Sequence, residues 1–64
     1  MNQKQQREYV YWRAPQMARS GQFRNWHEIE TQLRYEGAPE ARHELRGNAT
    51  RRWLDQLCDE ARQD

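Results

Sequence analysis

The chain has 64 residues, of which only seven are Leu, Ile, Val or Phe, and its net charge is +1 at pH 7. One core of this size seldom supplies more than about 3–5 kcal/mol of stability. We therefore exclude a two-domain enzyme, a Rossmann or barrel fold and a large substrate cavity. Three Trp and three Tyr compensate in part, because each aromatic side chain can bury about 150–250 Å². The prediction is a single domain over residues 1–64 that gains stability from a partner or from self-association.

The sequence favours a cytoplasmic protein without a membrane partner. Its longest apolar run covers residues 9–12, whereas a membrane span needs about 20 apolar residues and a signal peptide about 7–15. The single cysteine, Cys58, excludes an internal disulfide and a multi-cysteine zinc site. His27 and His43 lie on different predicted helices, and no Gly-rich phosphate loop is present. We therefore expect no cofactor, no metal and no small-molecule substrate.

Charge is unevenly distributed along the chain. Residues 1–27 hold five basic side chains and one acidic one, whereas residues 28–64 hold six and nine. The first part also contains the aromatic cluster of residues 9–12, and Pro15 disfavours a helical conformation at Ala14. We therefore predict an irregular, basic and aromatic N-terminal arm over residues 1–24. A basic arm on an acidic body favours self-pairing or an anionic partner.

Residues 26–36 carry the clearest helix signal. Asn25 is a good N-cap, and Glu28 stands three residues later, at the spacing of a capping box. Apolar residues then recur at helical spacing, at Trp26, Ile29 and Leu33. Gly37 is the expected end of this helix.

Two more helices complete a predicted three-helix body over residues 25–64. Pro39 opens a short helix that reaches Arg46. Asn48 or Thr50 caps the last one, which reaches about Arg62 and has an apolar face typical of a core helix. This face contains Trp53, Leu54, Leu57, Cys58 and Ala61. The predicted fold class is all-α.

No residue is assigned a catalytic role, and we expect that the chain is not an enzyme. Cys58 lies on the apolar face beside Asp59, and both burial and a neighbouring acid raise a thiol pKa, which opposes nucleophilic activation. Two carboxylate pairs at helical spacing, Asp55 with Asp59 and Glu40 with Glu44, read as solvated faces because a chain this short has little room for a pocket.

The leading hypothesis is a non-enzymatic protein-interaction module, a homodimer or an accessory or regulatory factor. Trp, Tyr and Arg dominate binding hot spots, and the arm concentrates them. The predicted partner-binding residues are Tyr9, Tyr11, Trp12 and Arg13.

The alternative hypothesis is a nucleic-acid-binding regulator. Proteins bind single-stranded nucleic acids with aromatic side chains that stack on the bases and basic side chains that bind the phosphates, and the arm contains both. In addition, the backbone amides of residues 47–50 with Arg51 and Arg52 could form an anion site at a helix start. In the plainer interpretation Arg51 pairs with Asp55 and Arg52 points to water. The residues of this alternative are Arg13, Arg19, Arg24, Arg51 and Arg52.

One resemblance extends over residues 18–61. The segments Ala18-Arg19-Ser20-Gly21, Trp26-His27-Glu28-Ile29-Glu30, Leu33-Arg34, Glu36-Gly37, Leu54-Asp55 and Leu57-Cys58 resemble short uncharacterised bacterial and prophage-type proteins. The resemblance implies a bacterial or phage setting and no particular activity.

Overall fold

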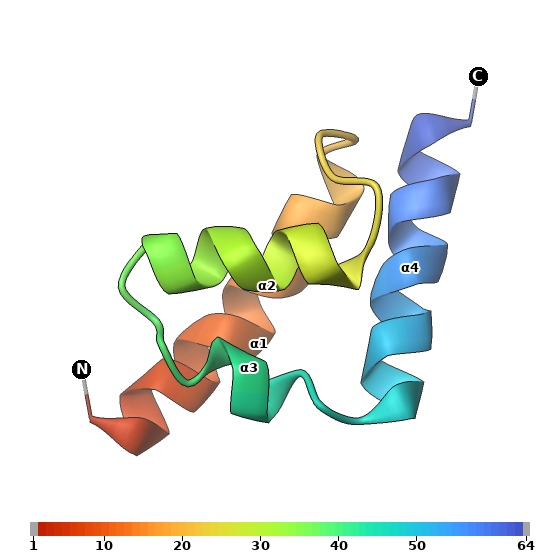
Figure 1. Cartoon of the computed structure of the whole chain (residues 1–64). Coiled ribbons are helices and arrows are strands. Elements are labelled where there is room, and N and C mark those ends of the chain that lie inside the picture. Colours follow the sequence, from red (N-terminus) through yellow and green to blue (C-terminus); the bar gives the residue numbers. More distant parts are fainter. Residues whose placement is uncertain (1, 64) are drawn as a thin grey trace.

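Four helices lie in the part of the chain that the computed structural model describes, residues 2–63. They are α1 (Gln3–Arg19), α2 (Trp26–Tyr35), α3 (Ala41–Glu44) and α4 (Asn48–Arg62). In Figure 1, α2 crosses α1, α4 stands along one side of the pair, and the single turn of α3 lies below α2. α1 packs most extensively on α4. The all-α prediction is confirmed.

The irregular arm predicted for residues 1–24 is wrong, because most of it forms the longest helix described. Asn2 caps α1: its side chain accepts a hydrogen bond from the Gln5 backbone at 2.8 Å, and the Gln5 side chain accepts one from the Asn2 backbone at 3.1 Å. Pro15 lies inside this helix, although an interior proline costs about 3 kcal/mol. Burial of the inner face offsets this cost, since each large apolar side chain contributes about 1.5–3 kcal/mol. The face consists of Val10, Ala14, Met17 and Ala18.

The core gathers buried side chains from every helix. Ile29 and Leu33 of α2 and Leu54 and Cys58 of α4 are fully buried with the inner face of α1, and Leu45 closes the core next to α3. Apolar contact between these helices holds the domain together. The chain therefore builds a core of its own.

The boundaries of α2 follow the prediction to within one residue. The Asn25 side chain accepts a hydrogen bond from the Glu28 backbone at 3.1 Å, as the cap predicts. In a capping box the Glu28 side chain would accept a hydrogen bond from the backbone of Asn25. It accepts instead from the backbone of Arg24, one residue earlier, at 2.7 Å. Gly37 ends the helix region at φ 102°, a backbone conformation in which glycine is favoured.

The last two helices differ more from the sequence-based boundaries. Pro39 precedes α3, which is a single turn without a side-chain cap. α4 begins at Asn48 after Gly47, and neither Asn48 nor Thr50 serves as its N-cap. Asp55 of α4 joins this helix to the start of α2, because its carboxylate accepts a hydrogen bond from the Trp26 backbone at 2.8 Å.

Candidate functional site

α1 directs the four predicted partner-binding residues to three different sides. Tyr9 and Arg13 turn to α2, Tyr11 turns to the end of α3, and Trp12 faces outward with 61% of its surface exposed. Successive residues of a helix point about 100° apart, so a cluster that is contiguous in sequence is divided once it becomes helical. The structure therefore does not bring all four side chains together on one face of α1.

The flank of α1 that faces α2 is a saturated polar network, the Glu36 cluster, made of Tyr9, Arg13, Gln32 and Glu36. The Tyr9 hydroxyl donates to Glu36 Oε1 at 2.7 Å, and Arg13 donates to both carboxylate oxygens at 3.3 and 3.2 Å. Gln32 donates to Oε2 at 3.3 Å. These donors lower the pKa of Glu36, with Arg13 as the largest cause. The same hydrogen bond to Glu36 raises the pKa of Tyr9. The cluster joins α1 to α2.

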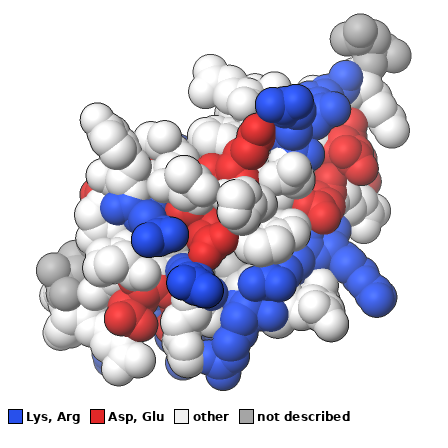
Figure 2. All heavy atoms as spheres, viewed as in Figure 1, with Lys and Arg blue, Asp and Glu red and all other residues white. Residues whose placement is uncertain are grey.

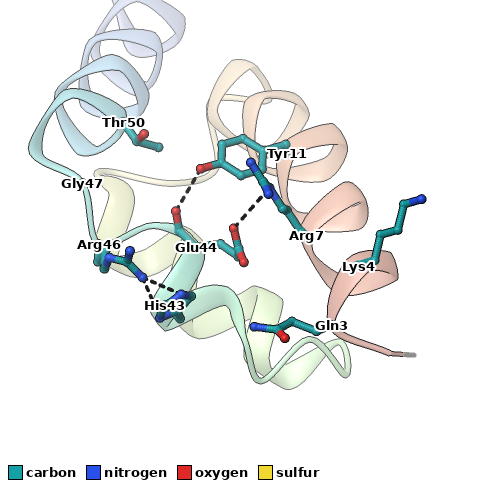
Figure 3. A pocket seen from close by; sticks show the side chains of 9 residues that line it. All are labelled: Gln3, Lys4, Arg7, Tyr11, His43, Glu44, Arg46, Gly47 and Thr50. Carbon is teal, nitrogen blue, oxygen red and sulfur yellow. Dashed lines mark hydrogen bonds and ion pairs between the residues drawn. The ribbon is translucent and has the colours of Figure 1, made fainter.

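The opposite flank of α1 borders a hollow of about 560 Å³ between this helix and the connection from α3 to α4 (Figure 3). We call it the basic hollow. Its lining residues are Gln3, Lys4, Arg7, Tyr11, His43, Glu44, Arg46, Gly47 and Thr50. The expectation that so short a chain has little room for a pocket is wrong. The short α3 and the extended residues after it leave this space beside α1 unfilled.

Three cations and one carboxylate surround the basic hollow. Arg7 forms a long ion pair with Glu44 at 3.8 Å, and the Tyr11 hydroxyl donates to the Glu44 backbone carbonyl at 3.1 Å. Arg46 lies against the His43 ring, with one guanidinium nitrogen 2.7 Å from Nδ1. Figure 3 shows Lys4 at the rim with its ammonium turned away from Glu44. Within residues 2–63, Lys4 and Arg46 have no acidic partner.

The outward face of α1 carries a stripe at helical spacing, which we call the outer stripe. It consists of Glu8, Trp12, Pro15 and Arg19. These positions lie at i, i+4, i+7 and i+11 and therefore align along one side of the helix, opposite the buried face. The Tyr9 ring supports the Trp12 indole, with ring centroids 6.1 Å apart. Trp12 is thus a large exposed apolar side chain with a fixed neighbour.

The alternative set of anion-binding arginines is mostly engaged within the fold. Arg13 binds Glu36, Arg24 pairs with Glu28 at 3.2 Å, and Arg51 lies 3.9 Å over the Trp26 ring while donating to the Leu45 carbonyl. The Arg51–Asp55 pair of the plainer interpretation is not formed: Arg51 contacts Leu45 and Trp26 instead, and Asp55 accepts from the Trp26 backbone. Arg19 and Arg52 are exposed.

Basic side chains nevertheless collect near the predicted helix start. Figure 2 shows a continuous strip of Lys and Arg over the connection between α3 and α4 and the first turns of α4. Gly47 and Thr50 line the basic hollow, but the cations that share it are Lys4, Arg7 and Arg46, and the predicted Arg51 and Arg52 do not line it.

Cys58 has the environment of a core residue. It is buried, and burial is the largest cause that raises the pKa of its thiol, followed by the charges of Asp55 and Asp59. The thiol therefore stays protonated near neutral pH, which opposes nucleophilic reactivity. No cluster of metal-ligating side chains occurs among residues 2–63, and no helix in this range is long and apolar enough to cross a membrane.

The site residues predicted from the sequence do not include Lys4, Arg7, Glu36, Glu44 or Arg46. A usable signal existed for part of this set: Lys4, Arg7 and Tyr11 recur at i, i+3 and i+7, which places them on one face once the segment is helical. Glu36 and Arg46 carry no such signal, because their roles depend on contacts between helices. No family model, curated protein or solved structure matches this chain.

Proposed function

We propose that this chain is a non-enzymatic, self-associating interaction module whose contact surface is the outer stripe of α1. The observation that carries the proposal is the 61% exposure of Trp12 in the middle of a helix whose opposite face is completely buried. Trp is the residue most enriched in binding hot spots. Because the chain has its own core, the exposed Trp12, and not a shortage of apolar residues, favours a partner.

A second copy of the chain fits the outer stripe because the stripe is complementary to itself. Glu8 stands near one end and Arg19 at the other. When two α1 helices pair antiparallel with Trp12 opposite Pro15 of the other copy, the same register places Glu8 opposite Arg19. Such an isologous contact repeats each pair twice about a two-fold axis. The stripe offers four side chains per copy, far fewer than the roughly 20–30 residues a side of stable interfaces, so the dimer should be reversible.

Sedimentation from micromolar to millimolar concentration tests this proposal. The wild-type chain should shift from monomer to dimer, and Trp12→Ala should remain monomeric. Tyr35→Ala is the matched control, because Tyr35 is 86% exposed on α2 and lies off the stripe. Equal association of the two variants would contradict the proposed surface.

Charge reversal tests the register. Glu8→Arg and Arg19→Glu should each weaken association by placing like charges opposite one another. The double variant restores opposite charges and should recover most of the affinity. Failure of the double variant to recover would exclude antiparallel pairing in this register.

A nucleic-acid-binding role is a second candidate, supported by the strip of Lys and Arg over the start of α4 in Figure 2. Binding to mixed-sequence DNA at two salt concentrations separates it from self-association. Phosphate contacts release counterions, so affinity must fall steeply with salt. Salt-insensitive or absent binding would exclude this role.

A further inference from the structure

The basic hollow has the size of a small-ligand site, and its lining is mostly polar and charged. Its volume of about 560 Å³ lies within the roughly 300–1,000 Å³ of such sites. Its walls come from two parts of the chain that are far apart in sequence, α1 and residues 43–50. The Tyr11 hydroxyl bridges them by its hydrogen bond to the Glu44 carbonyl. The hollow therefore has one fixed wall that does not depend on a ligand.

The charge around the hollow is not balanced by the protein. Glu44 is the one acidic side chain among its lining residues, and it is already paired with Arg7. Lys4 and Arg46 remain without an acidic partner within residues 2–63. This differs from the Glu36 cluster, where one carboxylate takes every donor around it. Positive charge in a concave site attracts an anion more strongly than the same charge on a convex surface.

We propose that the basic hollow binds the phosphate groups of a small ligand that carries two or more negative charges. Arg7 and Arg46 would donate to the phosphate oxygens, because guanidinium groups match oxyanions in geometry. Lys4 would swing inward from the rim, which its exposed and flexible side chain permits. This proposal goes beyond self-association and does not depend on it.

Titration of the full chain with sodium pyrophosphate, followed by calorimetry and by backbone amide chemical shifts, tests the proposal. Saturable binding should shift the amides of residues 3–11 and 43–50. Arg46→Gln should weaken binding by about tenfold or more, the effect of losing one charge-assisted hydrogen bond. Arg34→Gln is the matched control, since it removes the same charge from an exposed position of α2 that does not line the hollow.

Three probes identify the source of the phosphate. Tighter binding of ADP than of pyrophosphate would assign a nucleotide, with the Tyr11 ring available to its base. Tighter binding of a 5′-phosphorylated oligothymidine would assign the phosphates of a nucleic-acid strand, and preference for pyrophosphate itself would assign a free phosphate ligand. Any of these outcomes supports phosphate recognition, provided that Arg46→Gln also weakens binding of the preferred probe.

Two outcomes would overturn the proposal. One is the absence of saturable pyrophosphate binding, and the other is an equal loss in Arg34→Gln and Arg46→Gln, which would indicate diffuse attraction to net charge. Trp12→Ala should bind pyrophosphate as the wild-type chain does, because Trp12 does not line the hollow. Loss of self-association and loss of phosphate binding are therefore distinguishable.

Discussion

The two flanks of α1 use the same residue types in opposite ways. Each flank has a tyrosine, an arginine from α1 and a glutamate from another helix. In the Glu36 cluster, three side chains donate to one carboxylate within 3.3 Å. At the basic hollow, Glu44 has one long ion pair, and two cations have no carboxylate partner among residues 2–63. A cluster in which each donor side chain already binds a carboxylate stabilises the fold, whereas one with unpaired cations is available to a ligand.

The largest expected difference between the flanks comes from the same substitution on each side. Glu36→Gln should destabilise the fold by about 2 kcal/mol, because Arg13 loses its counterion and the tie between α1 and α2 weakens. Glu44→Gln should cost less than half as much, because its only ion pair is long and its partner Arg7 is exposed. Urea unfolding of both variants measures the difference. Equal losses of stability in the two variants would mean that Glu36 and Glu44 contribute alike to the fold, which contradicts the proposed difference between the flanks.

The two tyrosines allow a second matched comparison. Tyr9→Phe removes a hydrogen bond to a carboxylate and should cost about 1–1.5 kcal/mol, whereas Tyr11→Phe removes an exposed one to a backbone carbonyl and should cost roughly 0.5 kcal/mol. Thermal unfolding at neutral pH would show the order. A larger loss for Tyr11→Phe would mean that the hollow, not the Glu36 cluster, fastens α1.

The sequence predicted those elements whose signals are local. Asn25 and the apolar spacing after it identified α2 because cap and stripe belong to one segment. α1 was missed because Pro15 outweighed the recurrence of Val10, Ala14 and Met17 at helical spacing. The local rule for proline is correct in free peptides, but here tertiary burial offsets its cost.

The candidate site was harder to predict for a related reason. Tyr9 and Glu36 are 27 residues apart, and Tyr11 and Glu44 are 33 apart. Nothing local in the sequence pairs them, and the flank to which each tyrosine turns is fixed only once the segment is helical. Arg51 illustrates the same limit, since its contact with Trp26 joins two helices. Pairings of this kind follow from packing between helices.

The Glu36 cluster should also make stability depend on pH at both extremes, with smaller effects than the substitutions. The pKa of Glu36 is lowered in the fold, so its contribution is present above its ordinary value of 4.5 and is lost as pH falls through the folded value. The pKa of Tyr9 is raised, so its contribution is present below 10 and is lost as pH rises further. Melting temperatures of Glu36→Gln should decline less than those of the wild-type chain toward acid, and those of Tyr9→Phe less toward alkali. If the melting temperatures of both variants change with pH as steeply as those of the wild-type chain, groups other than Glu36 and Tyr9 cause the pH dependence.

The smallest expected effect is a gain in affinity for pyrophosphate, and it should occur at the basic hollow and not at the Glu36 cluster. Glu44→Gln removes the one carboxylate from the basic hollow, so pyrophosphate should bind about threefold more tightly, a modest change because charges 4 Å apart in water interact by only about 1 kcal/mol. Glu36→Gln should leave the affinity unchanged, since Glu36 binds Tyr9 and Arg13 on the other flank of α1 and does not line the hollow. Calorimetry at low ionic strength, below the unfolding temperature of both variants, measures the two values. Weaker binding in Glu44→Gln would mean that the Glu44 carboxylate helps the ligand by orienting Arg7 more than it hinders the ligand by repulsion. Tighter binding in both variants would mean that the affinity responds only to the net charge of the chain.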